Sequence, residues 1–466
     1  MRPALRLICA LLGAPLCGSR AAAQATLPDL PTREDRILAV STIWSEAKRS
    51  FAYWDRVPPT FDWDAQYRAT LAEIIAVADF PSYVQVLRRF TASLRDGHTL
   101  VQAPQRVVDA RYWDGPWVSL RAVGTRAIVA NVDSVLADSI PIGSEVIAID
   151  GVSTEQRIEQ VKPYHAASTP HVWTSDVIQF SGRNGIGILA GRADAPMTLT
   201  LAHENGTRRT VSVRRDRGSR RSAWLRPPVA LPLVEARPLA DGMLYLAINS
   251  FNDRALAARL DSLRPMMERA RGIVIDIRRN PGGNSGNGYL ALQHHFGSRA
   301  FTTSAWRSRT EIQSRRAWGK QAVEQGDSTS ENARHWRGVT WFQQPGERME
   351  ITSRVLDRSI PIAVLISRQT GSAAEDFLVA LDGDPRFTIV GEPTNGSTGQ
   401  PIFVGLPGGL TLWICTKRDA YPDGREFVGV GVQPQVLALE TVESLRRGQD
   451  VALDAGMRVL RERAAR

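Results

Sequence analysis

Lysine is scarce in this sequence. The chain of 466 residues has 58 Lys+Arg, of which only four are lysine, Lys48, Lys162, Lys320 and Lys417, so 54 are arginine. Arginine stays protonated in proteins and cannot act as a general base. Catalysis by an amine is therefore restricted to four positions, and the arginine bias itself indicates genome composition rather than function.

Cysteine is equally scarce. The three cysteines are Cys9, Cys17 and Cys415, and no histidine stands near them at the spacing of a zinc site. Loss of a leader containing Cys9 and Cys17 would leave Cys415 alone, without an internal disulfide. The apolar Leu412-Trp413-Ile414 before Cys415 favours a buried structural thiol over a nucleophile. We expect no metal and no cofactor.

Long apolar runs are absent. No stretch reaches about 18 uninterrupted apolar residues, so the sequence predicts no membrane span. Residues 1–25 have the features of a secretory signal peptide, with Arg2 and Arg6 before an apolar run at 7–16 and small residues at 21–25. A lipoprotein site at Cys17 fits less well, because Leu16 is bulky where such sites carry a small residue. We expect an exported protein, periplasmic or extracellular.

Helical periodicity marks residues 30–108. With 43% apolar residues the chain is not disordered, and its length predicts two or three domains. Thr32 and Asp35 resemble the start of a helix, and Pro81 suits the start of another. Spacings of three and four place one apolar set on a common helix face: Ile37, Val40, Trp44, Ala47 and Phe51. We expect an N-terminal helical domain here.

Short strand-like runs mark residues 109–217. The runs at 127–132 and 145–149 are apolar, and alternating residues flank Asn205-Gly206, a strong hairpin signal. The sequence predicts a small β-rich domain. Eight arginines against one acid between 208 and 226 then indicate a strand end that runs into an exposed linker, residues 218–228.

Residues 229–466 have the pattern of an α/β unit. Dense β-branched runs at 272–277 and 361–366, each followed by a helical segment, predict strands that are covered on both faces. The polar stretch 303–358 predicts an insertion beside the site, and 451–463 predicts an amphipathic helix. The whole chain is therefore predicted to be multidomain α/β.

The net charge of +10 could suggest a nucleic-acid partner. Three arginines of the predicted leader and the arginines of 208–226 account for this excess, and the rest of the chain is balanced. No recognition helix or basic platform with interleaved aromatics is visible. We expect no nucleic-acid partner, and nothing in the sequence indicates an oligomeric state.

Ser372 stands at a turn between a predicted buried strand and a helix that starts near Ala373. A helix N-terminus offers free N–H groups to an oxyanion, which suits a nucleophile at this place. Ser372 with Glu375 is also a capping box, the ordinary alternative.

A loop of Pro281-Gly282-Gly283 follows the other predicted buried strand and could present an N–H to the same point, although a plain strand-to-helix loop would look the same. Of seven histidines, only His98 lies in a tight turn between Asp-Gly and Thr.

These segments, in this order, resemble the S41 family of serine peptidases, which includes tail-specific (carboxyl-terminal processing) proteases and the tricorn core protease. The resemblance covers about residues 33–462 and rests on these segments: 94–99, 272–283, 362–377, 390–399 and 421–434. It implies a PDZ-like β domain over 109–217 and a crotonase-like/ClpP-type α/β peptidase core over 229–466. It also implies protein or peptide substrates.

The resemblance implies roles for individual residues. Ser372 matches the nucleophile, and the N–H groups of Ala373 and of Gly282 or Gly283 match the oxyanion hole. In the processing branch a lysine base stands where this chain has Ser397, so the Ser–Lys dyad is absent.

The tricorn-like branch uses a histidine, and His98 matches it. Its intrinsic pKa suits a general base, whereas Lys417 would need strong desolvation. The third catalytic residue is expected to be Glu426, although the position nearest the family's usual Glu is Val428; Asp423 and Glu375 are alternatives. A non-catalytic peptide- or small-molecule-binding protein on the same scaffold is the alternative to a peptidase.

Overall fold

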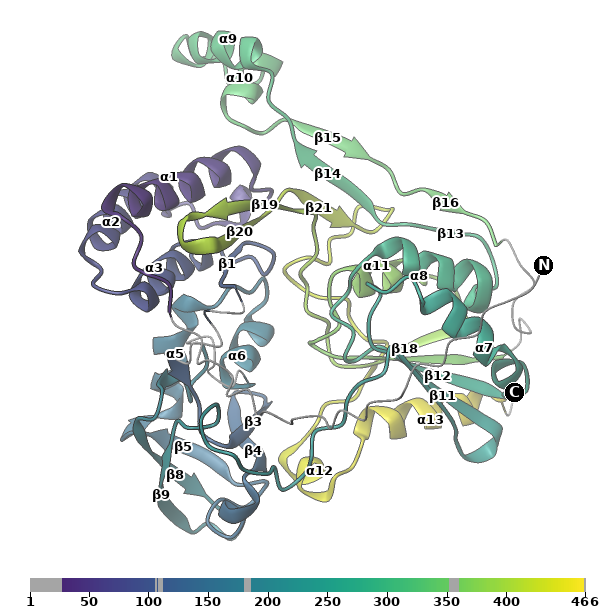
Figure 1. Cartoon of the computed structure of the whole chain (residues 1–466). Coiled ribbons are helices and arrows are strands. Elements are labelled where there is room, and N and C mark those ends of the chain that lie inside the picture. The colour runs from purple at the N-terminus through teal and green to yellow at the C-terminus, as the bar shows by residue number, and fades with distance from the viewer. Residues whose placement is uncertain (1–26, 105–106, 108–111, 180–185, 352–359, 465–466) are drawn as a thin grey trace, which may run out of the picture.

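A computed structural model describes residues 27–104, 107, 112–179, 186–351 and 360–464 (Figure 1). The chain is mixed α/β and multidomain, as predicted, with a helical unit, a β-rich unit and a larger α/β unit. The predicted signal peptide, residues 1–25, lies outside the described residues and so do Cys9 and Cys17.

The N-terminal helices are confirmed. They are α1 (Arg33–Ser50), α2 (Trp63–Ala76) and α3 (Phe80–Ala92). The Thr32 hydroxyl accepts the Asp35 N–H at 3.1 Å, which satisfies a free donor of the first turn. After α3, strand β1 (Leu100–Gln102) pairs antiparallel with β20 (Leu410–Cys415), which pairs with β19 (Pro401–Leu406). This pairing fastens the helical unit to a distant part of the chain.

The β-rich unit has its own buried core. Its antiparallel sheet runs in the order β3 (Val118–Val123), β4 (Arg126–Val132), β5 (Glu145–Ile149), β8 (Pro196–Ala202) and β9 (Arg208–Arg214). The remaining elements are β2 (Trp113–Asp114), β6 (Val152–Ser153), α5 (Thr154–Val161), α6 (Pro170–Gln179) and β7 (Gly191–Arg192). The hairpin predicted at Asn205-Gly206 joins β8 to β9 and is confirmed.

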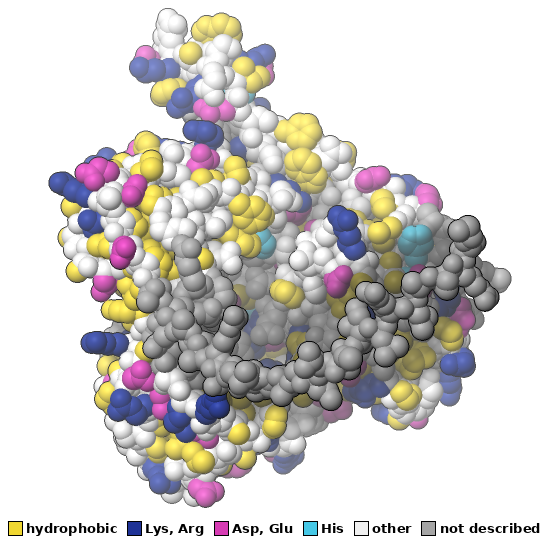
Figure 2. Space-filling model, viewed as in Figure 1, with side chains coloured by type: hydrophobic (Ala, Val, Ile, Leu, Met, Phe, Trp, Pro, Cys, Tyr) yellow, Lys and Arg dark blue, Asp and Glu magenta, His cyan; other side chains and the backbone are white. Residues whose placement is uncertain are grey.

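Two arginines of the stretch 208–226 form ion pairs with carboxylates of the β-rich unit. Arg215 is only 7% exposed, and it donates to the Leu189 carbonyl at 3.2 Å and pairs with Asp150 at 3.0 Å. Arg220 contacts the buried carboxylate of Asp133. These carboxylates neutralise the guanidinium groups of Arg215, just after β9, and of Arg220. No residue of the predicted linker, 218–228, is buried. On the face seen in Figure 2, basic and acidic side chains are interspersed.

The α/β unit is built on a six-stranded sheet. Its order is β10 (Val234–Pro238), β11 (Met243–Ile248), β12 (Gly272–Asp276), β17 (Ile362–Ile366), β18 (Phe387–Gly391) and β22 (Val436–Leu437). Strand β10 is antiparallel to its neighbour and the others are parallel. The two strands predicted from β-branched runs are its centre, β12 and β17.

Helices cover both faces of this sheet (Figure 1). On β12, Ile273 and Ile275 belong to the same buried cluster as residues of α7 (Leu256–Glu268), α8 (Ser285–Ala291) and α11 (Ala373–Ala380). Val274 points the other way and packs with α13 (Val451–Ala464), the predicted C-terminal helix. This alternation with period two explains why both strands are apolar throughout. The short helix α12 (Val442–Arg447) precedes α13.

The predicted insertion forms an arm that projects from the molecule (Figure 1). Its elements are β13 (Phe301–Thr302), β14 (Ala305–Arg309), α9 (Gln313–Glu324), α10 (Glu331–Trp336), β15 (Trp341–Gln344) and β16 (Arg348–Met349). Strand β14 pairs with β15 and with β21 (Lys417–Ala420). The base of the arm is thereby tied to the segment that follows β20.

Candidate active site

Ser372 occupies a strained turn between β17 and α11. Its φ is +53° and its ψ is −126°, a backbone conformation that residues other than glycine rarely adopt. It caps α11 and is partly exposed, while the helix behind it is buried. The sequence predicted this placement, and the turn holds the serine next to the free N–H groups of a helix N-terminus.

Gly282 packs directly against this turn. A Cβ built on Gly282 would lie 2.7 Å from Ser372 Cβ and 2.9 Å from the Ala373 nitrogen, so only glycine allows the approach. The Gly282 N–H donates to Asn280 Oδ1 at 2.9 Å and is already used. Among the described residues, the N–H groups of Ala373 and Gly283 have no hydrogen-bond acceptor. They are the two donors left for an oxyanion.

His98 lies in the turn between α3 and β1. Its Nδ1 is 2.7 Å from the hydroxyl of Ser397. The next residue, Thr99, accepts the Cys415 N–H at 3.1 Å and donates to Asp96 at 2.7 Å, which anchors the turn to β20. Burial lowers the pKa of His98 and Lys417 adds to this, while Asp96 and Asp376 oppose it; the net direction is down. The imidazole is therefore neutral at pH 7.

Ser397 joins the histidine to the serine. Its carbonyl accepts the Ser372 N–H at 3.0 Å, while its hydroxyl contacts His98. No hydrogen bond joins the side chains of Ser372 and His98 within the described structure. The two predicted catalytic residues, although 274 positions apart in the sequence, meet at one residue of the loop 396–399.

Glu375 holds that loop in place. Its fully buried carboxylate accepts hydrogen bonds from the Thr394 hydroxyl (2.5 Å) and from three backbone N–H groups, those of Gly396 (2.7 Å), Ser372 (3.1 Å) and Ser397 (3.2 Å). Burial raises the pKa of Glu375 to about 8 against these four bonds. Both oxygens face the loop and neither contacts His98, so the capping role of Glu375 is the one that the geometry supports.

Glu426 does not reach His98. It forms ion pairs with Arg56 and Arg418 at 2.6 Å and with Arg307 at 3.3 Å. The bridge between Ala420 and Glu426 aligns it with β21, beside these guanidinium groups. Glu426, expected as the third catalytic residue, is thus placed by the structure in an arginine cluster.

The alternative Asp423 is exposed and pairs with Arg425 at 2.7 Å. Of the three carboxylates considered from the sequence, none makes a hydrogen bond to His98 in the described part of the chain. The position nearest the family's usual Glu is Val428 in this chain. None of these three carboxylates takes its place beside His98 in the described structure.

Two buried aspartates beside the site escaped sequence reasoning. Asp376 accepts the hydroxyls of Ser285 (2.6 Å) and Ser304 (2.7 Å). Asp419 pairs with Lys417 at 2.7 Å, and burial and the negative charge of Asp376 raise its pKa to about 7. Asp376 stands four residues after Ser372, one helical turn on, and this spacing was the signal available.

Lys417 is excluded as a base by its surroundings. Burial opposes its protonation, but the carboxylates of Asp419 and Asp376 outweigh burial and raise its pKa. A lysine that is protonated at neutral pH cannot take a proton from a serine. Cys415, predicted to be structural, is fully buried and burial raises its pKa far above the ordinary value, so it is not a thiolate.

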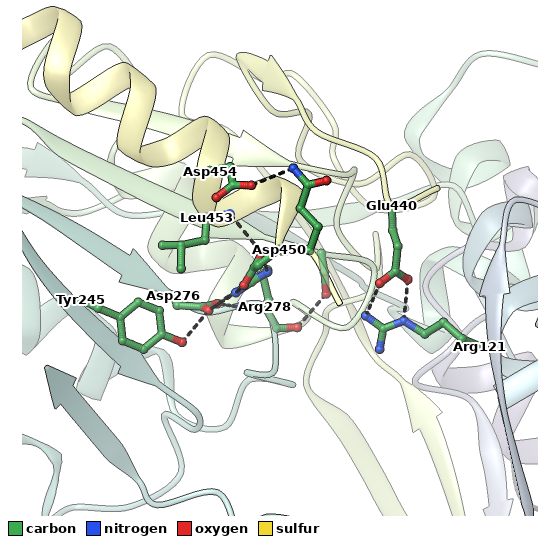
Figure 3. A network of polar contacts seen from close by, with 10 residues as sticks. Arg121, Tyr245, Asp276, Arg278, Glu440, Asp450, Leu453 and Asp454 are labelled. Atoms are coloured by element: carbon green, nitrogen blue, oxygen red, sulfur yellow. Dashed lines mark hydrogen bonds and ion pairs between the residues drawn. The ribbon is translucent and has the colours of Figure 1, made fainter. Parts of the chain in front are cut away.

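A cavity of about 450 Å³ lies where the β-rich unit meets the α/β unit. Its charged side chains pair with one another, Arg121 with Glu440 (2.7 Å) and Arg278 with Asp276 and Asp450 (2.6 Å each), as Figure 3 shows. Neither the serine nor the histidine described above lines it. The Arg121–Glu440 pair joins the two units, whereas Arg278, Asp276 and Asp450 all belong to the α/β unit.

In the described ranges, no group of three or more His, Cys, Asp or Glu side chains could hold a metal ion. A search of the same ranges finds no helix with the length and apolar character that crossing a membrane requires.

Two curated proteins are similar to this chain. A carboxy-terminal-processing protease of Bartonella bacilliformis is 23% identical over 283 residues, 59% of this chain and 55% of that protein. The chloroplastic carboxyl-terminal-processing peptidase 3 of Arabidopsis thaliana is 22% identical over 400 residues, 82% of this chain and 65% of that protein. The chain thus spans less than two thirds of the length of either relative.

A solved structure shares the fold. Mature CPAF complexed with lactacystin has a TM-score of 0.66 at 15% identity, over 92% of this chain and 98% of that one. Mature CPAF alone gives the same score and identity, over 92% and 96% of the two chains. Residues 242–438, which carry the strand–turn–helix at Ser372, match the model of peptidase family S41. This part of the chain is therefore similar to peptidase family S41.

Proposed function

We propose that the protein is an exported serine endopeptidase that cleaves protein or peptide substrates. Ser372 is the nucleophile and His98 the general base. The observation that carries this proposal is the strained turn of Ser372 at the N-terminus of α11, joined through Ser397 to the one histidine in the site.

The proposed chemistry follows from these positions. A serine hydroxyl needs a base with a pKa near 7. His98 takes the proton of Ser372 as the Oγ–C bond to the substrate carbonyl forms, and it gives that proton to the leaving amine. Water then hydrolyses the acyl-enzyme by the same route. The free N–H groups of Ala373 and Gly283 are the donors proposed for the tetrahedral oxyanion.

The architecture supports a substrate that binds as an extended chain. We assign residues 30–108 to a helical domain, 109–217 to a PDZ-like domain, 218–228 to a linker and 229–466 to a crotonase-like/ClpP-type peptidase core. The separate core of the β-rich unit supports its division from the rest. The helices of 30–108 share one buried cluster with the α/β unit, so their assignment as a domain rests on the sequence pattern. Substrate would bind through its carboxyl-terminal residues at the PDZ-like domain or by addition of a strand.

Export rests on the sequence of residues 1–25, whose charged, apolar and small-residue segments follow the order of a signal peptide. Amino-terminal sequencing of the protein recovered from the periplasm or medium tests this point. Cleavage after residue 23 or 25 supports it, and recovery of the intact amino terminus in the cytoplasm contradicts it.

The test of the activity is hydrolysis of fluorescently labelled casein by the full chain and by Ser372→Ala and His98→Ala. Each change is expected to lower the rate at least about 100-fold, because either residue is needed for proton transfer. Ser262→Ala on the exposed face of α7 is the matched control. Undiminished cleavage by either variant contradicts the proposed mechanism. If the wild-type chain neither cleaves casein nor reacts with a fluorophosphonate, the alternative function is favoured, a non-catalytic binding protein on the same scaffold.

A further inference from the structure

Within the described residues, no carboxylate makes a hydrogen bond to the ring of His98, the proposed base, as one does in a Ser-His-acid arrangement. Such a carboxylate accepts a hydrogen bond from the Nδ1–H group and stabilises the imidazolium ion that forms when the serine is deprotonated. Glu426 and Glu375 are engaged elsewhere, by arginines and by the loop 394–397. Other groups are needed to orient the His98 ring and to supply the negative charge that stabilises its imidazolium form.

Ser397 has the geometry to hold the ring. Its hydroxyl is 2.7 Å from His98 Nδ1 and the residue is only 3% exposed. Its backbone is fixed on both sides, since the N–H donates to Glu375 at 3.2 Å and the carbonyl accepts from Ser372 at 3.0 Å. The contact is therefore made by a side chain that has little freedom to move.

Asp96 has the charge. It lies two residues before His98 and is 3% exposed. Its two oxygens accept hydrogen bonds from the hydroxyls of Thr99 (2.7 Å) and Ser168 (3.2 Å). Burial raises the pKa of Asp96, while His98 and these two hydroxyls oppose the rise by favouring the carboxylate. Its electrostatic interaction with His98 favours the imidazolium.

We propose that Ser397 and Asp96 share the work of the missing acid, an inference that rests on the proposed function. Ser397 is a positioning residue whose hydroxyl oxygen accepts a hydrogen bond from the Nδ1–H group of neutral His98, so that the lone pair remains on Nε2. When Ser372 attacks, its proton moves to Nε2, the Oγ–C bond forms, and the substrate carbonyl oxygen takes the negative charge. Ser397 Oγ still accepts from Nδ1, and the Asp96 carboxylate stabilises the new positive charge.

Other charged groups face His98. Asp376, on α11, also favours the imidazolium, while Lys417, on β21, disfavours it. Both carboxylate oxygens of Asp376 accept hydrogen bonds from serine hydroxyls, and Lys417 forms an ion pair with Asp419. Asp96 is the carboxylate on the same turn as His98, and its replacement by asparagine keeps the shape of the side chain while removing the charge.

Ser397→Ala removes the hydroxyl that contacts His98 and tests whether this contact positions the ring. With casein peptides as substrate, kcat is expected to fall at least about tenfold while KM changes less than about threefold, since only the base is misplaced. Thr398→Ala, in the same buried loop, is the matched control and is expected to retain kcat. Asp96→Asn is expected to lower kcat and to move the acidic limb of the kcat/KM profile to lower pH. Exposed Asp138→Asn is expected to leave that limb in place.

A measurement on the unsubstituted chain keeps the inference testable if a variant misfolds. Nitrogen NMR of ¹⁵N-histidine-labelled protein, with the His98 signal identified by its loss in His98→Ala, is expected to show the neutral ring protonated on Nδ1. Protonation on Nε2 would overturn the assignment. Unchanged kcat and pH profile in Ser397→Ala and Asp96→Asn, with inactive Ser372→Ala and His98→Ala, would overturn this inference alone. Full activity of Ser372→Ala would overturn the proposed function.

Discussion

Gly97 and Ser397 are in contact so close that no side chain fits between them. A Cβ built on Gly97 would lie 2.7 Å from Ser397 Oγ and 3.2 Å from Ser397 Cβ. The Gly97 N–H is fixed at 2.9 Å from the Ser168 hydroxyl, so the backbone has little room to retreat. Glycine at this position is therefore what allows the adjacent His98 to reach Ser397.

Gly97→Ala is expected to push Ser397 away from His98 and to lower kcat about 10- to 100-fold, because displacements of about 1 Å are costly in an active site. Gly405→Ala, where nothing lies within 4 Å of the added methyl, is the control. The rate of casein hydrolysis and the melting temperature are measured for both. Wild-type activity in Gly97→Ala would show that the contact is dispensable.

Gly282→Ala is expected to lower kcat by about 100-fold or more, since the new methyl would collide with Ser372 Cβ and the Ala373 nitrogen. Gly282 also has φ of +107°, so part of any effect would be backbone strain. Gly206→Ala carries the same kind of strain at φ +81° with nothing within 4 Å. Equal losses of activity in the two variants would argue against a role for Gly282 at the serine.

The activity is expected to persist below pH 6.5. Its acidic limb reports protonation of the base, and burial lowers the pKa of His98. Lys417→Met removes a positive charge that also lowers this pKa, so the limb should move to higher pH while activity at pH 8 is largely kept. Loss of all activity at pH 8 in a folded Lys417→Met protein would instead indicate that Lys417 is the base.

Glu375 makes the stability of the fold depend on pH. Its pKa is about 8 in the folded chain and about 4.3 when unfolded, so between these values only the folded state holds the proton. The free energy of unfolding therefore falls as pH rises through this window, by up to about 1.4 kcal/mol per pH unit. Urea unfolding at pH 5, 6, 7 and 8 measures the slope. Glu375→Gln should flatten it, and an identical slope in that variant would exclude Glu375 as its source.

Patterns that are local in the sequence predicted much of the fold. The helices before residue 95, the hairpin at Asn205-Gly206 and the central strands β12 and β17 follow from periodicity and turn chemistry. The turn of Ser372 follows from a strand that runs directly into a helix cap. Each of these features depends on residues within one element and its flanks.

Contacts between distant segments were not predictable in this way. His98 and Ser397 are 299 positions apart, and they meet because β1 pairs with β20, a register that no local pattern shows. Glu426 is held by Arg56 of the helical unit and by Arg307 of the arm. A charge in the sequence does not reveal its partner, so these ion pairs of Glu426 could not be predicted.

Ser372, not its neighbour Ser397, is the proposed nucleophile that His98 activates. Peptide mapping by mass spectrometry of the chain after reaction with a fluorophosphonate tests it most directly. One adduct is expected, on the peptide that contains Ser372, and it should be abolished by Ser372→Ala and strongly slowed by His98→Ala. An adduct on Ser397, or labelling that persists in Ser372→Ala, would contradict it.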